Sequence, residues 1–115
     1  MPFMILKTSM YCAEEKQASL LKETSAILAE VIGKPEAYVM VTLEQSPIFM
    51  GGTDEPAAFA DVRSIGGLSP EVNKSISAKL AEVLENHLGI PRARFYLNFS
   101  DVQSTHWGYN GGTFG

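Results

Sequence analysis

The chain has 115 residues and a mass of 12.5 kDa, and its 9 basic and 13 acidic side chains give a formal net charge of −4. Hydrophobic residues make up 45% of the sequence and charged residues 19%, which is typical of one globular domain and excludes a disordered chain. The net negative charge does not favour binding to nucleic acid, so we expect no DNA or RNA partner. The single cysteine, Cys12, excludes a disulfide framework and a zinc site built from thiolates.

The start of the chain carries no targeting signal that we can identify. Residues 1–7 lack a basic stretch and a cleavage site, and no apolar run of about 18 residues occurs anywhere. We therefore expect no signal peptide, no membrane span and a cytoplasmic protein.

Each half of the chain predicts a strand, a helix and a second strand. Alternation and β-branched or aromatic residues indicate the strands, and apolar residues at helical spacing indicate the helices. In chain order, the predicted elements are a strand at 3–8, a helix at 14–32, a strand at 38–43, a strand at 58–65, a helix at 70–88 and a strand at 94–100.

Local signals mark the ends of the predicted helices. Ser69, Pro70 and Glu71 supply an N-cap, a proline at the first helical position and an acidic first turn. Gly33 and Gly89 fit the two helix C-termini.

The sequence contains an internal repeat. A Gly-x-Pro-x-Ala motif begins at Gly33 and recurs 56 residues later at Gly89, and the same offset pairs Phe3 with Phe59. Residues 1–115 are therefore predicted to form a single domain, built from two pseudo-repeats at about 2–57 and 58–115.

The predicted fold class is α/β (α+β), in which two βαβ pseudo-repeats form a four-stranded mixed sheet with two helices on one face. The other face then needs a cover, because alternation along the last strand places there Arg94, Tyr96 and Asn98. We expect oligomerisation to supply this cover, with sheets packed face to face around an axis and exposed edges paired with a neighbour's strand.

Pro2 is the candidate catalytic residue, because the usual constellations are missing. His87 and His106 lack metal-ligand spacing, and no Gly-x-Ser-x-Gly elbow occurs. Removal of Met1 would free the secondary amine of Pro2, whose pKa of about 8 falls when an apolar pocket disfavours the cation. Such an amine suits a general base at neutral pH, whereas the alternative is a proline that simply opens a strand.

Three further polar residues are candidates for binding. Lys34 follows the first helix, where it could hold a substrate carboxylate or only compensate the helix dipole. Tyr96 and Asn98 could line a pocket between subunits or make ordinary subunit contacts.

Four aromatic residues, three of them near the C-terminus, are further candidates for a binding site. Tyr38, Trp107, Tyr109 and Phe114 could wall a site for an aromatic substrate or anchor the chain end. The tail at 108–115 matches no phosphate-binding loop and predicts a turn with a short hairpin. Nothing in the sequence indicates a cofactor or a metal.

Taken together, several motifs resemble the macrophage migration inhibitory factor family. They are Pro2 behind Met1, Gly33-Lys34-Pro35, Gly51-Gly52-x-x-Glu55-Pro56, Ser64-Ile65-Gly66, Tyr96-x-Asn98 and Thr113-Phe114. Their order and spacing cover essentially the whole chain. The resemblance implies a homotrimer with active sites at the subunit interfaces, in a superfamily of tautomerases.

The resemblance also implies an activity and the residues that carry it. It implies a cofactor-free isomerase that interconverts keto and enol forms of phenylpyruvate-like acids and isomerises dopachrome analogues. Pro2 would be the base, Lys34 would hold the substrate carboxylate and Ile65 would contribute its backbone amide. From the adjacent subunit, Asn98 would bond the substrate's distal hydroxyl and Tyr96 would border Pro2.

Pocket positions partly follow the family and partly depart from it. Tyr38 and Phe114 match aromatic positions of the family's pocket. Trp107 and Tyr109 stand where a valine and a tryptophan are usual, and Phe3 replaces a methionine beside the proline. Substrate preference is therefore the property that these departures affect, and proton transfer need not change.

Two other functions stay open at this point. The resemblance implies a cytokine-like ligand that is exported without a leader and binds a host receptor, and this binding would not depend on catalysis.

The resemblance also concerns a third activity, thiol-disulfide exchange. Residues 57–60 stand where animal members have Cys-x-x-Cys, so we expect no thiol-disulfide activity. Without the resemblance, a ferredoxin-like regulatory domain that binds a small ligand between subunits would also fit.

Overall fold

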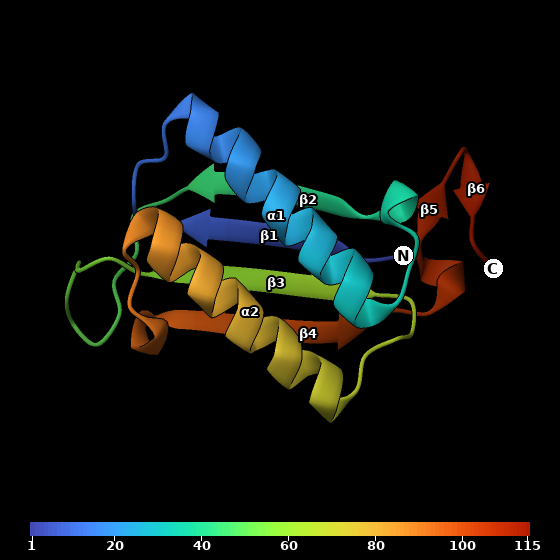
Figure 1. Cartoon of the computed structure of the whole chain (residues 1–115). Coiled ribbons are helices and arrows are strands. Elements are labelled where there is room, and N and C mark those ends of the chain that lie inside the picture. Colours follow the sequence, from blue (N-terminus) through green and yellow to red (C-terminus); the bar gives the residue numbers. More distant parts are fainter.

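The computed structural model describes all residues 1–115 and contains a four-stranded mixed sheet with two long helices on one face (Figure 1). The strand order is β2-β1-β3-β4, with β1 parallel to β2, β1 antiparallel to β3 and β3 parallel to β4. The bounds are β1 Phe3–Thr8, α1 Glu14–Ile32, β2 Met40–Gln45, β3 Ala58–Ser64, α2 Pro70–Leu88, β4 Phe95–Asp101, β5 Gly108–Tyr109 and β6 Gly112–Thr113. The predicted α+β architecture is confirmed.

The helices begin and end where their local signals predict. The Ser69 hydroxyl accepts a hydrogen bond from the Val72 N–H at 3.1 Å, and Pro70 occupies the first turn of α2. Gly33 and Gly89 adopt the left-handed conformation, with φ of 78° and 65°, and end the two helices. Neither helix is both long enough and apolar enough to cross a membrane.

The second strand begins two residues later than the sequence predicts. The strand expected at 38–43 is Met40–Gln45, and Tyr38 ends a short 3-10 helix at Glu36–Tyr38. The Tyr38 N–H donates to the Pro35 carbonyl at 3.1 Å, so a local turn takes the backbone group that a strand would need. This turn directs Tyr38 away from the sheet and toward the chain start.

Arg94 is likewise outside its predicted strand, which covers Phe95–Asp101 instead of 94–100. Arg94 ends a 3-10 helix, and its guanidinium donates to carbonyls of the loop before β3. The acceptors are Pro56 at 3.0 Å, Met50 at 2.9 Å, Thr53 at 3.3 Å and Glu55 at 3.0 Å. Arg94 therefore fastens this loop and does not share the open sheet face with Tyr96 and Asn98, which corrects the prediction.

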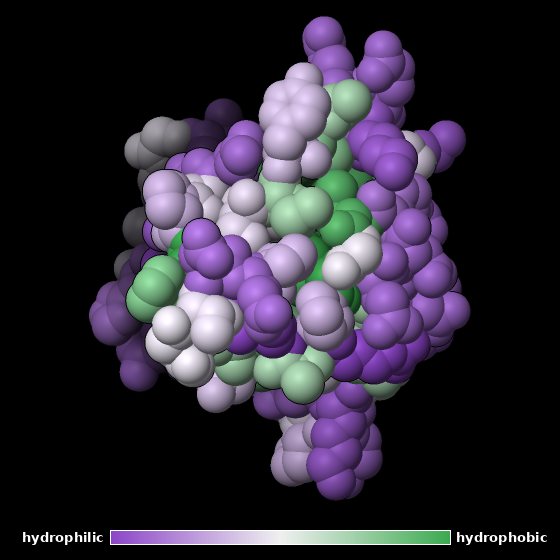
Figure 2. Space-filling model, turned by 90° about the vertical axis from the view of Figure 1, so that its left-hand side faces the viewer, coloured by the Kyte–Doolittle hydropathy of each residue, from purple (hydrophilic) through white to green (hydrophobic).

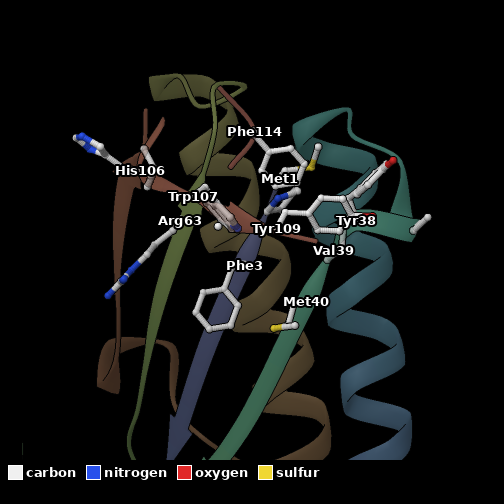
Figure 3. Close-up of a pocket in the computed structure, with 14 residues that line it drawn as sticks. Met1, Phe3, Tyr38, Val39, Met40, Arg63, His106, Trp107, Tyr109 and Phe114 are labelled. Atoms are coloured by element: carbon white, nitrogen blue, oxygen red, sulfur yellow. The ribbon is translucent and has the colours of Figure 1, made fainter. Parts of the chain in front are cut away.

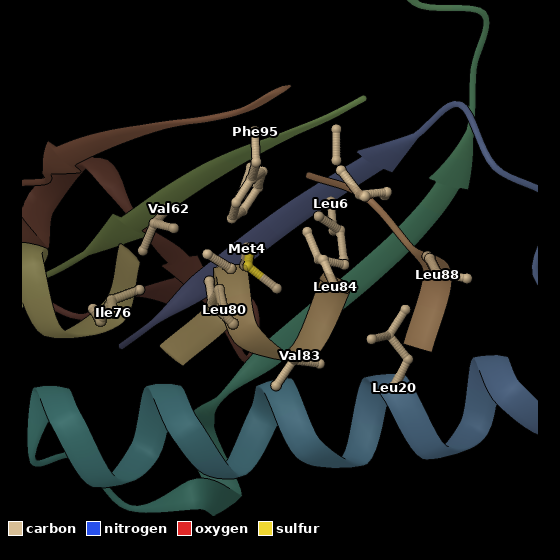
Figure 4. Packing of buried hydrophobic residues seen from close by; sticks show 14 of the residues in the cluster. Met4, Leu6, Leu20, Val62, Ile76, Leu80, Val83, Leu84, Leu88 and Phe95 are labelled. Carbon is tan, nitrogen blue, oxygen red and sulfur yellow. The ribbon is translucent and has the colours of Figure 1, made fainter. Parts of the chain in front are cut away.

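The core lies between the helices and the sheet. The two helices run antiparallel, side by side across the strands (Figure 1). Alternate residues of β1, including the fully buried Met4 and Leu6, meet Leu20 from α1 and Leu80 and Leu84 from α2 (Figure 4). Burial of a side chain of this size stabilises the fold by about 1.5–3 kcal/mol, so this layer holds β1 firmly in place.

The opposite face of the sheet carries no covering element in this chain. Cross-strand register places Phe3 of β1 beside Met40 of β2 and Arg63 of β3 on this open face. Met40 is 62% exposed, and Tyr96 of β4 is 67% exposed. Large side chains are thus left in solvent on one side of the sheet, as the sequence predicts.

Candidate active site

A cavity of about 550 Å³ opens where the start of β1 meets the C-terminal hairpin (Figure 3). This volume lies within the range of small-molecule sites. Most of its lining is hydrophobic. The lining residues are Met1, Pro2, Phe3, Ala37, Tyr38, Val39, Met40, Arg63, Val102, His106, Trp107, Gly108, Tyr109 and Phe114.

Pro2 is fully buried at this cavity, immediately before the central strand β1. Its carbonyl accepts a hydrogen bond from the Met40 N–H at 3.1 Å, which continues the pairing of β1 with β2. Proline lacks an N–H, so its nitrogen leaves no donor unpaired at this position. In the full chain this nitrogen is part of the peptide bond to Met1, which also lines the cavity.

The N-terminal amine lies in an environment that disfavours positive charge. Burial lowers the pKa of the Met1 α-amine below 8.0, and the nearby charge of Lys34 lowers it further. Lys34 directly follows Gly33, the residue that ends α1. The end of this helix therefore brings a cation close to the start of the chain.

Three aromatic rings form one wall of the cavity. Tyr109 and Phe114 stack with ring centroids 4.8 Å apart and an interplanar angle of 9°. Tyr38 packs edge-on against both, with centroid distances of 6.0 and 6.4 Å. These are the edge-to-face and stacked arrangements that aromatic pairs prefer, so the three rings support one another as one wall of the cavity.

A tight hairpin brings the tail residues to this wall. Asn110 and Gly111 both have positive φ, 52° and 78°, as the two-residue turn between β5 and β6 requires. The Phe114 N–H then donates to the Trp107 carbonyl at 3.2 Å. The predicted short hairpin in the tail is confirmed.

The structure brings together five of the nine candidate site residues and places Lys34 near them. Pro2, Tyr38, Trp107, Tyr109 and Phe114 all line the cavity.

Ile65 follows β3 and does not line the cavity. The loop it begins is held to the end of β4, because the Gly66 N–H donates to the Asp101 carboxylate at 2.9 Å. This contact fixes the backbone beside Ile65.

Tyr96 and Asn98 lie away from the cavity of their own chain. Both are exposed residues of β4, and Ser100 of that strand pairs with Arg63, which itself pairs with Phe3. Asn98 precedes Ser100 by two residues and Tyr96 precedes it by four. Measured along the strand, they lie about 7 and 13 Å from the level of Phe3. Within one chain neither side chain reaches Pro2.

Several cavity residues were missed by the sequence analysis. Arg63, His106, Met40 and Val39 line the cavity, and none was singled out as a site residue. Alternation along β3 does place Arg63 on the face away from the helices. However, Arg63 borders a cavity only because the C-terminal residues 106–114 pack beside this end of the sheet. Local sequence patterns do not predict where that segment packs.

The other end of the molecule differs in character. Hydrophilic residues cover most of it, around a smaller hydrophobic area (Figure 2). A second hollow is lined by Ser9, Gln45, Ser46, Pro47, Ile48, Phe49 and Asp54, most of them polar. The aromatic cavity beside Pro2 is therefore the better candidate for a small-molecule site.

Comparison with known proteins identifies the family. The family model for macrophage migration inhibitory factor matches residues 1–115. A macrophage migration inhibitory factor homologue from Trichuris trichiura is 44% identical, over 99% of this chain and 100% of its own length. The chain therefore belongs to the macrophage migration inhibitory factor family, which confirms the resemblance seen in the sequence.

Solved structures agree with this assignment. The homologue from Prochlorococcus marinus has a TM-score of 0.93 and 38% identity, and covers 98% of this chain and 99% of its own. The similar protein from Entamoeba histolytica has a TM-score of 0.94 and 34% identity, and covers 98% of both chains. The sheet and helices described above are thus those of the family.

The loop after β3 provides a test of how Lys34 is positioned. Gly66 and Gly67 both have positive φ, 70° and 79°. A Cβ on Gly67 would lie 2.7 Å from the Ile32 Cγ2 atom and 3.4 Å from the Lys34 Cε atom, whereas a Cβ on Gly66 would meet nothing within 4 Å.

We expect Gly66→Ala to lower the free energy of unfolding by about 1–2 kcal/mol, through backbone strain alone. Gly67→Ala is expected to lose about 1–3 kcal/mol more, because Ile32 and Lys34 must also shift. Urea unfolding of both variants measures the difference. Equal losses would mean that Gly67 does not pack against the end of α1.

Proposed function

We propose that the chain, once Met1 has been removed, is a cofactor-free keto–enol tautomerase of small aromatic α-keto acids, of the phenylpyruvate and dopachrome type. The proposal depends on one observation above all. Pro2 is buried at an aromatic cavity in which the chain's α-amine has a lowered pKa. Membership of the macrophage migration inhibitory factor family supports the same function.

Pro2 supplies the base. Without Met1 its nitrogen is a secondary amine, and the burial and the Lys34 charge that lower the pKa of the Met1 amine favour the neutral form of an amine at this place. The neutral amine takes the proton from the enol oxygen, or from the carbon beside the carbonyl, and returns a proton at the other position. The σ bonds made and broken are those to hydrogen, while the π bond shifts between the C=C of the enol and the C=O of the keto form. General acid-base catalysis of this kind contributes about a hundred- to ten-thousandfold.

The remaining groups hold the substrate. Lys34 binds the carboxylate of the α-keto acid, and the backbone amide of Ile65 assists. The rings of Tyr38, Tyr109 and Phe114 pack against the aromatic ring of the substrate. This arrangement positions the reacting carbon at Pro2 and keeps water from the amine.

The site is completed by a second subunit in a homotrimer. Tyr96 and Asn98 are exposed on the open sheet face and lie too far along β4 to reach their own Pro2. A neighbour packed against this face covers Met40 and Tyr96 and brings its own Asn98 to the substrate's distal hydroxyl. Oligomerisation and catalysis are therefore coupled through one surface.

One prediction of the proposed function concerns the state of the N-terminus. Protein with Met1 removed should convert the enol form of hydroxyphenylpyruvate to the keto form. The conversion is measured by the change in ultraviolet absorbance. Protein with Met1 retained should lose at least about a hundredfold in kcat/KM, because an amide nitrogen is not a base and the methionine lies in the cavity.

The processed Pro2→Gly variant, which has a primary amine in place of the proline nitrogen, is the matched control and should also be strongly impaired. Equal activity with and without Met1 would contradict the role of Pro2. No activity in any form would favour a ligand whose function is binding and signalling.

Another prediction of the proposed function concerns Lys34 and the pH dependence of the activity. The neutral amine is the active form, so kcat/KM should rise with pH to a plateau, with a midpoint below 8.0, the ordinary pKa of an α-amine. Lys34→Met removes a charge that lowers the amine pKa, so the midpoint should move to higher pH, while KM rises because the carboxylate loses its partner.

Lys22→Met serves as the control, since Lys22 is an exposed cation on α1. The pH midpoint of kcat/KM and the KM of Lys22→Met should match those of the unchanged protein. A Lys34→Met profile identical to that of Lys22→Met would contradict the proximity of Lys34 to the base.

A further inference from the structure

The peptide that joins Ser64 to Ile65 has a defined direction at the end of β3. Strand β3 lies between β1 and β4 (Figure 1), and the Ser64 carbonyl accepts a hydrogen bond from the Val102 N–H at 2.9 Å, on the β4 side. All peptide bonds in the chain are trans, and the C=O and N–H of a planar trans peptide point in opposite directions. The Ile65 N–H therefore points away from β4, toward the side on which β1 lies.

This N–H is a free donor beside the start of the chain. The antiparallel register of β1 with β3, continued beyond its last pair, places Met1 level with Ile65. The Ile65 N–H nevertheless has no hydrogen-bond partner within the chain. Removal of Met1 takes away the residue opposite Ile65, so the donor is then left without a backbone group across from it, next to Pro2.

Asp101 holds the following peptide in the same extended direction. Strand β4 ends at Asp101, whose Oδ1 atom accepts a hydrogen bond from the Gly66 N–H at 2.9 Å. In a strand, the N–H groups of successive residues point to opposite edges, so the Gly66 N–H points toward β4 and the Asp101 side chain replaces a further backbone acceptor there. The peptides on both sides of Ile65 are therefore fixed from β4.

The chain leaves the sheet directly after this bond. Gly66 and Gly67 both have positive φ, 70° and 79°, in the region that glycine adopts most easily. The Gly66 carbonyl accepts a hydrogen bond from the buried Ser64 hydroxyl at 2.7 Å, but the Gly66 N–H has Asp101 as its partner. Loss of this carboxylate would free the peptide between Ile65 and Gly66 to rotate.

We propose that Asp101 is a positioning residue for the substrate site. Its bond to Gly66 keeps Ile65 extended, so that the free Ile65 N–H stays directed at the carboxylate of the α-keto acid. Asp101 acts through the backbone and not by touching the substrate. This inference rests on the tautomerase function and on the role of the Ile65 amide proposed above.

The test measures KM and kcat for phenylpyruvate with protein that lacks Met1. Asp101→Ala removes both the charge and the acceptor for the Gly66 N–H, whereas Asp101→Asn removes the charge and keeps an oxygen acceptor. Asp54→Ala is the control, because Asp54 is an exposed carboxylate beside the second hollow, at the other end of the molecule.

We expect KM to rise about two- to tenfold in Asp101→Ala with kcat nearly unchanged, as the weakening of one hydrogen bond to bound substrate predicts. Asp101→Asn and Asp54→Ala should keep the KM of the unchanged protein. Loss of a negative charge by itself would lower KM for an anionic substrate, so a rise identifies the hydrogen bond as the cause. A KM that does not rise in Asp101→Ala, or that rises equally in Asp101→Asn, would overturn the role of Asp101.

If phenylpyruvate is not converted, the tautomerase proposal fails, and binding decides the inference separately. The carboxylate 3-phenylpropionate is then titrated into isotope-labelled protein, and the NMR signal of the Ile65 amide is followed. A shift of this signal in the unchanged protein and in Asp101→Asn, reduced in Asp101→Ala, supports the positioning role. No shift in the unchanged protein, or equal shifts in the two Asp101 variants, overturns it.

Discussion

The pairing of β1 on both of its edges is the constraint on which the rest of the structure depends. Because β1 lies between β2 and β3, its first residues cannot fray, and the bond from Met40 to the Pro2 carbonyl extends the pairing to the start of the chain. The buried layer under Met4 and Leu6 holds the strand from below. A chain terminus, usually the most mobile part of a protein, is thereby made a fixed group at a cavity.

Other elements build the cavity around this fixed point. The left-handed end of α1 brings Lys34 near the amine, and the 3-10 turn before β2 directs Tyr38 to the same place. The Asn110–Gly111 turn returns the tail, so that Tyr109 and Phe114 stack against Tyr38. Each device is local, but all of them act at one end of the central strand.

Helix signals and the repeat allowed much of this fold to be predicted from the sequence. The bounds of α1 and α2 follow from apolar spacing, from the Ser69 cap and from glycine at the helix ends. Strand starts were less predictable, because Tyr38 and Arg94 have strand-like neighbours yet complete turns that begin at proline. A turn and a strand use the same backbone N–H and C=O groups for their hydrogen bonds. Residue type alone does not show which of the two structures a segment adopts.

The candidate site was also predictable only in part, because residue type identifies some of its members and contacts between distant segments determine the others. Pro2 and the aromatic residues stand out by type, and the structure places them at one cavity. Arg63 and His106 were missed because their place at the cavity depends on contacts between distant segments. The expected contribution of Tyr96 and Asn98 depends on a neighbouring subunit, which no pattern within one chain defines.

A complementation experiment tests the shared site most directly. Processed Pro2→Gly subunits and processed subunits carrying both Tyr96→Ala and Asn98→Ala are each prepared, mixed in equal amounts, unfolded and refolded together. If each site takes Pro2 from one subunit and Tyr96 and Asn98 from the next, about a quarter of the sites in a random mixture combine intact groups. The mixture should then regain about a quarter of the unchanged protein's tautomerase activity. Activity no higher than the average of the two parent variants would contradict a site built between subunits.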